Sequence, residues 1–447
     1  MNDVAPLMVG ERILLKEHKL DLLISLLLLL LPLIFFWPVT LGGKTLLPVD
    51  NLFTFEPWAS FADEWGVSIP HNELLSDLIL ENYVWKGFIV QAIHNRQIPL
   101  WNPYLFAGLP FLAAGQHSAL YPLSILFYIL PLARAYGYFT ALQFSLAGLF
   151  MFIYCRVLGV NRFGALIAGI TYMLSAFFVV SVVFTMIIAA AAWLPLLLTM
   201  IEIVVRKQEE KGPVAYSPIP YIAVGAVALG FQLLAGHVEI SLYVLLVMGF
   251  YALGRLAILW WRQRRWPVVF RLASWLVVMV VLGLGLGAVQ FIPLYEVARL
   301  NFRQGSVPYS QVVSWAFPPR RLLAFLVPDF FGNPSHHSYL DVFTGRTVHL
   351  ALNAYGQLNP NGPHSTDWGV KNYVEGGSYL GLLPLLLVAV AVISHLRRHR
   401  RNSADTTLRA HVWLYTILIA FSLAFIFGTP LYAVLFYAFP GINQLHS

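Results

Sequence analysis

Residues 118–133 read SALYPLSILFYILPLA, and the topology of the whole chain depends on whether this stretch crosses a membrane. The stretch is shorter than the roughly 20 residues that a spanning helix needs, and it contains Pro122 and Pro131. The rest of the sequence offers nine apolar stretches that we predict to be transmembrane helices. They cover residues 22–37, 138–157, 163–182, 186–205, 219–236, 239–259, 272–292, 377–395 and 410–428.

Three basic segments between these stretches decide the topology. They occupy residues 206–211, 255–271 and 397–409. If 118–133 does not span, all three lie on the same side of the membrane as the N-terminus. Lys and Arg concentrate in cytoplasmic loops, and a tenth span would move all three segments outside. We therefore predict nine spans, a cytoplasmic N-terminus, and a juxtamembrane or re-entrant element at 118–133.

The composition agrees with a multi-pass protein of the cytoplasmic (inner) membrane. Of the 447 residues 59% are hydrophobic and 11% are charged, and the mean hydropathy is +0.71. An ordinary soluble domain carries about 25% charged residues. This low charged fraction excludes a cytosolic enzyme and a disordered chain. A nucleic-acid-binding module is excluded because the net charge of +7 is spread over short loops instead of forming one basic patch. A single cysteine, Cys155, excludes an intrachain disulfide.

Two long loops separate the predicted spans, and both lie outside in this topology. Loops of this length in a compact protein usually carry function. The chain divides into a cytoplasmic N-terminus (1–20), a first transmembrane helix (21–39), a first outer loop with juxtamembrane helices (40–137), transmembrane helices 2–7 (138–292), a second outer loop (293–376) and C-terminal transmembrane helices (377–447).

The first outer loop contains the same pair of residue types twice. Asp50 is followed eight residues later by Trp58, and Asp77 by Trp85. A carboxylate beside an aromatic ring near a bilayer is partly desolvated, so it can serve as a base or hold a cation. The pattern is equally typical of an exposed acidic loop whose tryptophans anchor it at the membrane surface. Spacing alone leaves both interpretations open.

Further candidate residues are ionisable groups at the predicted outer ends of spans or in the second outer loop: His237, Glu239, Arg320, Arg321, Asp329 and Glu375. Ionisable groups at membrane depth are costly and indicate function, whereas at a turn between helices they can simply be solvated. No spacing typical of a metal site is present, although carboxylate oxygens also suit a divalent cation. The GLGLG run at 283–287 lies inside an apolar span, so we predict a helix-packing surface rather than a nucleotide loop.

Several longer motifs follow one another in the order of a known family. They are NELLSD (72–77), PLWNPYLFAG (99–108), RVLG (156–159), AAAAWLPLLL (189–198), LAGHVEISLY (234–243), LLAFLVPDFFGNP (322–334) and YVEGGSYLGLLPLLL (373–387). Together with the repeated Asp and Trp pair, they resemble the bacterial YfhO-like membrane proteins over residues 45–390. Members of that family are often considerably longer, which fits a truncated chain here.

The resemblance implies a GT-C-like, all-α polytopic fold and membrane glycosyltransferase activity. Such enzymes transfer a sugar from a polyprenyl-phosphate carrier to an acceptor outside the cytoplasmic membrane, and their catalytic aspartate lies in the first outer loop. Carried onto this chain, Asp50 and Asp77 are the candidate bases. Arg320 and Arg321 are the candidate phosphate ligands, because arginine can hold phosphate oxygens in pairs.

Two other classes of protein remain open at this stage. A non-catalytic subunit of a membrane complex would share the topology without needing either aspartate. A transporter or lipid-carrier flippase would place ionisable residues within the spans. The predicted spans carry few charges and the acidic residues gather in the outer loops, which favours an enzyme at the membrane surface.

Overall fold

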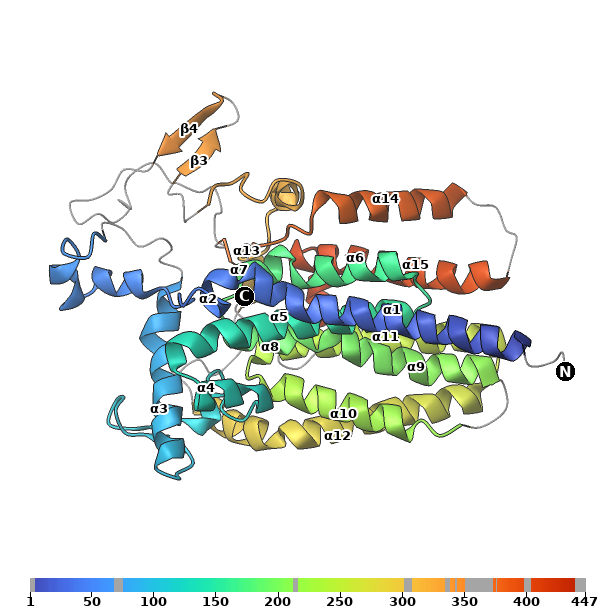
Figure 1. Cartoon of the computed structure of the whole chain (residues 1–447), viewed down its shortest axis with the longest axis horizontal. Helices are drawn as coiled ribbons and strands as arrows, with labels where there is room; N and C mark the ends of the chain where they lie inside the picture. The colour runs from blue at the N-terminus through green and yellow to red at the C-terminus, as the bar shows by residue number, and fades with distance from the viewer. Residues whose placement is uncertain are drawn as a thin grey trace.

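The computed structural model describes residues 5–67, 75–211, 216–300, 308–333, 338–341, 344–349, 373–374, 376–397 and 403–438. Long helices lie side by side along the longest axis of the molecule (Figure 1). Within these described residues, six segments are long and apolar enough to cross a membrane. They are Leu132–Val157 (α5), Arg162–Val180 (α6, Arg162–Met173, and α7, Ala176–Val180), Thr185–Glu210 (α8, Thr185–Ala192, and α9, Leu194–Lys211), Val238–Gln263 (α11), Trp266–Ala298 (α12) and Arg409–Ile426 in α15 (Ser403–Ile426).

Three further helices complete this bundle: α1 (Ala5–Phe35), α10 (Ile219–Leu234) and α14 (Leu382–Arg397). Apolar helices of this length cross a bilayer because they satisfy their own backbone hydrogen bonds. The chain is therefore a helical multi-pass membrane protein. The number of spans and the GT-C topology stay predictions.

Residues 118–133 do not form a continuous helix. They contain a short 3₁₀ turn, η6 (Pro122–Ser124), and α4 (Ile125–Ile129), and α5 begins at Leu132. A five-residue helix such as α4 rises only about 7.5 Å, a quarter of the hydrocarbon thickness. The segment is therefore too short to cross a membrane as a helix, as its length and prolines predict.

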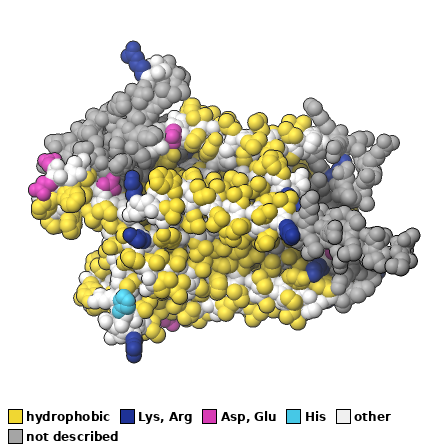
Figure 2. All heavy atoms as spheres, in the orientation of Figure 1, with side chains coloured by type: hydrophobic (Ala, Val, Ile, Leu, Met, Phe, Trp, Pro, Cys, Tyr) yellow, Lys and Arg dark blue, Asp and Glu magenta, His cyan; other side chains and the backbone are white. Residues whose placement is uncertain are grey.

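The two ends of the bundle differ in content. At the end that holds the N-terminus, Asp21 of α1 pairs with Arg162 at 2.8 Å and with Arg156 at 3.3 Å. The opposite end, here named the loop end, holds α2 (Trp37–Thr40), α3 (Tyr83–His94) and the hairpin of β3 (Ser338–Asp341) and β4 (Arg346–His349), as Figure 1 shows. Between the two ends hydrophobic side chains dominate the visible face (Figure 2), as expected for a surface in contact with lipid.

The close contact of α10 with α12 explains the glycine run. Cβ atoms on Gly283 and Gly287 would overlap or crowd the side chains of Leu229 and Leu233, whereas Gly285 faces open space. Small residues let membrane helices approach closely enough for dispersion contacts, which replace the hydrophobic effect within lipid. The predicted packing role of GLGLG is confirmed.

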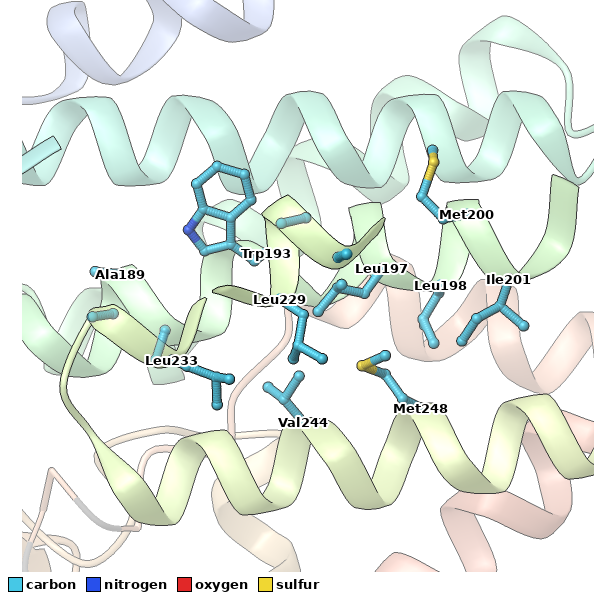
Figure 3. Close-up of a cluster of buried hydrophobic side chains, with 14 of the residues drawn as sticks. Ala189, Trp193, Leu197, Leu198, Met200, Ile201, Leu229, Leu233, Val244 and Met248 are labelled. Atoms are coloured by element: carbon cyan, nitrogen blue, oxygen red, sulfur yellow. The ribbon is translucent and has the colours of Figure 1, made fainter. Parts of the chain in front are cut away.

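The main core lies where α8, α9, α10 and α11 meet (Figure 3). Trp193 sits between Phe150 of α5 and Phe231 of α10, with ring centres 5.3 and 5.5 Å away. Its indole N–H donates a hydrogen bond to the hydroxyl of Tyr121, which in turn donates to Gln143. A residue from the loop segment 118–133 thus packs inside the bundle, which fixes the first loop to the helices.

One basic residue lies elsewhere than the sequence analysis placed it. Arg255 was assigned to a cytoplasmic loop, but α11 continues to Gln263 and the Arg255 side chain is completely buried. Its guanidinium donates to both carboxylate oxygens of Glu202, at 2.6 and 3.1 Å, and to Glu209 at 3.0 Å. The apolar stretch predicted to end near residue 259 therefore contains a compensated charge inside the bundle.

Candidate functional site

The described part of the first loop, residues 41–67 and 75–131, is built from short elements. They are η1 (Val49–Thr54), η2 (Trp58–Phe61), the π-helical turn η4 (Leu78–Asn82), α3, the hairpin β1 (Trp101–Asn102) and β2 (Leu109–Pro110), η5 (Leu112–Ala114), η6 and α4. In the hairpin Trp101 pairs with Pro110 and Asn102 with Leu109. Helix α3 runs across the bundle axis at the loop end (Figure 1).

The two candidate bases lie on elements that touch. Asp50 is half-buried in the first turn of η1, and Asp77 is exposed directly before η4, and η1 packs against η4. Burial and the nearby charge of Asp77 raise the pKa of Glu81. Asp77 directly precedes the π-helical turn and Glu81 lies within it, and such turns are often found at functional sites.

Helix α3 buries a lysine that the sequence pattern does not single out. Lys86 lies on the same helix face as Ile89 and Ala92, and its side chain has no exposed surface. The ammonium donates a hydrogen bond to the carbonyl oxygen of His117 at 2.6 Å and lies 4.4 Å from the ring centre of Phe127. Burial lowers the pKa of Lys86 to about 7. The spacing of buried residues along α3 is the signal that would have identified it.

His117 is fixed as a neutral imidazole beneath this lysine. Its Nδ1 accepts a hydrogen bond from the backbone N–H of Ala119 at 3.0 Å, and its Nε2 lies 3.0 Å from the carbonyl oxygen of Phe111. This geometry assigns the ring proton to Nε2. Burial and the charge of Lys86 lower the pKa of His117 to about 4. The ring therefore serves as a hydrogen-bonded packing group at neutral pH.

The segment around His117 docks the first loop onto the turn that contains His237. Ser118 donates a hydrogen bond to the carbonyl oxygen of Ala235 at 2.7 Å. Gly236 has a φ of +93° and lies so close to the carbonyl oxygen of Gly115 that a Cβ would overlap it. A glycine is required here for both reasons. The motif LAGHVEISLY thus contributes a docking surface, which the sequence analysis did not foresee.

His237 and Glu239 occupy the first turn of α11. His237 is its N-cap: Nδ1 accepts from the backbone N–H of Ile240 at 3.3 Å. Burial lowers the pKa of His237, while the Glu239 carboxylate acts in the opposite direction. Capping satisfies a backbone donor that would otherwise lack a partner. This histidine has a structural task in addition to any catalytic one.

The second loop forms a separate cluster. Asp329 accepts hydrogen bonds from the hydroxyl of Tyr373 at 2.8 Å and from the amide of Asn333 at 3.2 Å. Arg320 is exposed, with its guanidinium 5.7 Å from the ring centre of Phe331. Arg321 has no exposed surface and lies 5.6 Å from the ring centre of Phe317, so Arg320 is the accessible cation of the pair. Glu375 lies outside the described residues.

The structure thus brings together some of the predicted residues and leaves others in separate groups. Asp50 lies on η1 and Asp77 directly precedes η4, the element that η1 contacts, whereas Arg320 and Asp329 belong to the second-loop cluster. Among the described residues no three His, Cys, Asp or Glu side chains are placed so that they could hold a metal ion. The chemistry available at the loop end is that of carboxylates, an exposed arginine and tyrosine hydroxyls.

Comparison of the chain with protein-family models, with curated proteins and with solved structures finds no match. Its family is therefore not shown by similarity, and the resemblance to YfhO-like proteins stays an inference from the motifs.

Proposed function

We propose that the chain is a membrane glycosyltransferase that moves a sugar from a polyprenyl-phosphate carrier to an extracytoplasmic acceptor. One observation carries the proposal: two first-loop aspartates lie on contacting elements at the loop end of the bundle, where a lipid-borne donor would present its head group. The resemblance supplies the donor class, and the geometry supports the position of the base.

The proposed reaction is a direct displacement. Asp50 or Asp77 accepts the proton of an acceptor hydroxyl, and the resulting oxygen attacks the anomeric carbon. The bond between that carbon and the phosphate oxygen breaks, and the phosphate stays on the carrier. Holding the donor and acceptor in line supplies much of the rate enhancement without a covalent enzyme intermediate.

The departing phosphate needs a compensating positive charge. Arg320 is our choice, because its side chain is exposed, whereas Arg321 is covered by protein. The ordinary role for such a residue is to contact lipid head groups, and the same phosphate chemistry underlies both roles.

The experiment is transfer of labelled sugar from a set of polyprenyl-phosphate donors to membrane acceptors. Wild type is compared with Asp50→Asn, Asp77→Asn and the matched control Asp63→Asn, an exposed acid of the same loop. Loss of transfer in one of the first two variants, with Asp63→Asn unaffected and all proteins folded, identifies the base. Full transfer in both aspartate variants rejects the proposed site.

Two alternatives predict other results. A non-catalytic subunit transfers nothing from any donor, and both asparagine variants support its complex. A transporter would need charged residues within its spans that exchange partners during transport. Arg255 is a charged residue inside the bundle, but it is already paired with two carboxylates. An Arg255 variant that folds but loses substrate movement would favour the transporter.

A further inference from the structure

An uncharged segment of the first loop exposes large apolar side chains outside the helix bundle. Residues 98–115, IPLWNPYLFAGLPFLAAG, contain no charged residue. Leu100, Tyr104 and Phe106 are 61%, 73% and 90% exposed. Segments this apolar usually fold as a buried strand or helix, whereas this one forms the short hairpin of β1 and β2. Its exposed side chains therefore need a partner that is itself apolar.

The tip of this hairpin has a defined conformation. The backbone N–H of Gly108 donates to the carbonyl oxygen of Leu105 at 2.7 Å, and the Trp101 ring lies directly against Gly108. Phe106 and Ala107 have φ of +48° and +62°, in the left-handed region that favours glycine. The turn thus holds the Phe106 side chain outward although a glycine would fit the backbone more easily.

A contact with α12 fixes the depth of the hairpin. Gln290 donates a hydrogen bond to the carbonyl oxygen of Leu112, in η5 just after β2, at 2.8 Å. Gln290 precedes Glu296 by six residues, which corresponds to about 9 Å along the helix. Near it on α12, Val289 and Ile292 are 54% and 60% exposed. The hairpin is therefore attached to α12 beside exposed apolar side chains. The attachment point lies on the membrane side of Glu296, the next charged residue along the helix.

We propose that the hairpin tip, residues 104–106, inserts into the lipid leaflet at the loop end of the bundle. The η5 turn that follows the hairpin is hydrogen-bonded to α12 beside exposed Val289 and Ile292, and tyrosine and tryptophan are the residues that membrane interfaces favour. The tip enters only the interfacial part of the leaflet, where backbone groups without an internal hydrogen bond still meet water. Exposed Arg96, just before the segment, suits the phosphate head groups above. The inference rests on the membrane topology and is independent of sugar transfer.

The test places a fluorescent NBD label at the tip of the full-length chain. In a Cys155→Ala background, Phe106→Cys and Tyr104→Cys are labelled and reconstituted into phosphatidylcholine vesicles with or without lipids that carry a nitroxide near the top of the acyl chain. Asp63→Cys, in an exposed acidic part of the same loop, is the aqueous control. Val281→Cys, 60% exposed on α12, is the lipid control.

The proposal expects loss of NBD fluorescence at positions 104 and 106 when nitroxide lipids are present, as at position 281, and weak quenching by aqueous iodide. Quenching by iodide alone, as at position 63, would place the tip in water and overturn the proposal. Protection from both quenchers would show a protein partner or a second copy of the chain over the tip, which also overturns it. Quenching at position 281 by nitroxide lipids confirms that the protein is inserted in the bilayer. An absence of such quenching at positions 104 and 106 is then informative.

Discussion

Replacing Arg255 with methionine removes the charge that compensates two carboxylates inside the bundle. Arg255 and Glu202 have side chains that are 0% and 1% exposed, and the Glu209 side chain is 16% exposed. The hydroxyl of Tyr251 also donates to Glu202 at 2.7 Å, and His411 lies 3.5 Å from the same carboxylate. Methionine fills most of the arginine volume, so the change is chiefly one of charge.

The expected cost follows from the burial of the group left behind. Breaking a buried ion pair by removing one partner costs about 3–5 kcal/mol. Without the guanidinium, the buried Glu202 carboxylate keeps only the Tyr251 hydroxyl and the nearby His411. Replacing both partners by neutral groups costs much less, since no isolated charge remains. The double variant Arg255→Met/Glu202→Gln should therefore be more stable than Arg255→Met alone.

The single cysteine provides the assay. Cys155 is buried in α5, so a thiol-reactive fluorescent maleimide modifies it only when the bundle opens. Unfolding in mixed micelles with increasing SDS, followed by this labelling, gives the free energy of unfolding of each variant. The matched control is Arg262→Met: this side chain is 29% exposed and lies 3.8 Å from Glu209, so its loss should cost less than about 1 kcal/mol.

Two outcomes would refute the argument. If Arg255→Met is as stable as Arg262→Met, the buried pair contributes no more than a surface pair. If the double variant is no more stable than Arg255→Met, the cost comes from lost arginine packing rather than from an isolated carboxylate.

Three further predictions concern the loop end and the topology. The pKa of Lys86 falls from 10.5 to about 7 on folding, so between these pH values the unfolded chain binds more protons than the folded one. The free energy of unfolding should therefore rise with pH in this range. SDS unfolding at several pH values should show this slope in wild type and lose it in Lys86→Met. Gly236→Ala should destabilise the protein by about 1–3 kcal/mol, because the new Cβ strains the contact with the first loop. Gly249 has open space around it in α11, so the control Gly249→Ala should be neutral or slightly stabilising in the same Cys155 labelling assay. Cysteine at position 77 should react with an impermeant maleimide from outside intact cells, and cysteine at exposed position 265 only after lysis; the reverse result would invert the topology.

The bundle was predictable because apolar length alone determines where a chain can cross lipid. Residues 272–292 and 138–157 lie within α12 and α5, whose ends extend beyond the predicted spans. Hydropathy does not predict the ends of a helix, because a helix can continue beyond the hydrocarbon layer. Helix α11 runs on to Gln263, and Arg255 therefore lies inside a helix although the sequence pattern groups it with the basic segment 255–271.

The candidate site was predictable in location but not in detail. Asp50 and Asp77 were identified from a repeated pattern, and the contact between η1 and η4 depends on a tertiary fold that no local spacing encodes. The burial of Lys86 depends on Phe127 and the carbonyl of His117, both more than thirty residues away. Periodicity reveals which face of α3 is buried, but only the structure shows what covers it.

The same limit explains why the buried charges were missed. Glu202, Arg255 and His411 come from three helices, and they lie about 50 to 210 residues apart in the sequence. Each alone resembles a loop or helix-end residue. These residues form a polar contact between helices inside the bundle. If one helix shifted along another, apolar side chains would face the carboxylate and leave it without its charged partner. Hydrophobic length thus places the helices in the membrane, and the buried charges help to fix which helix faces which.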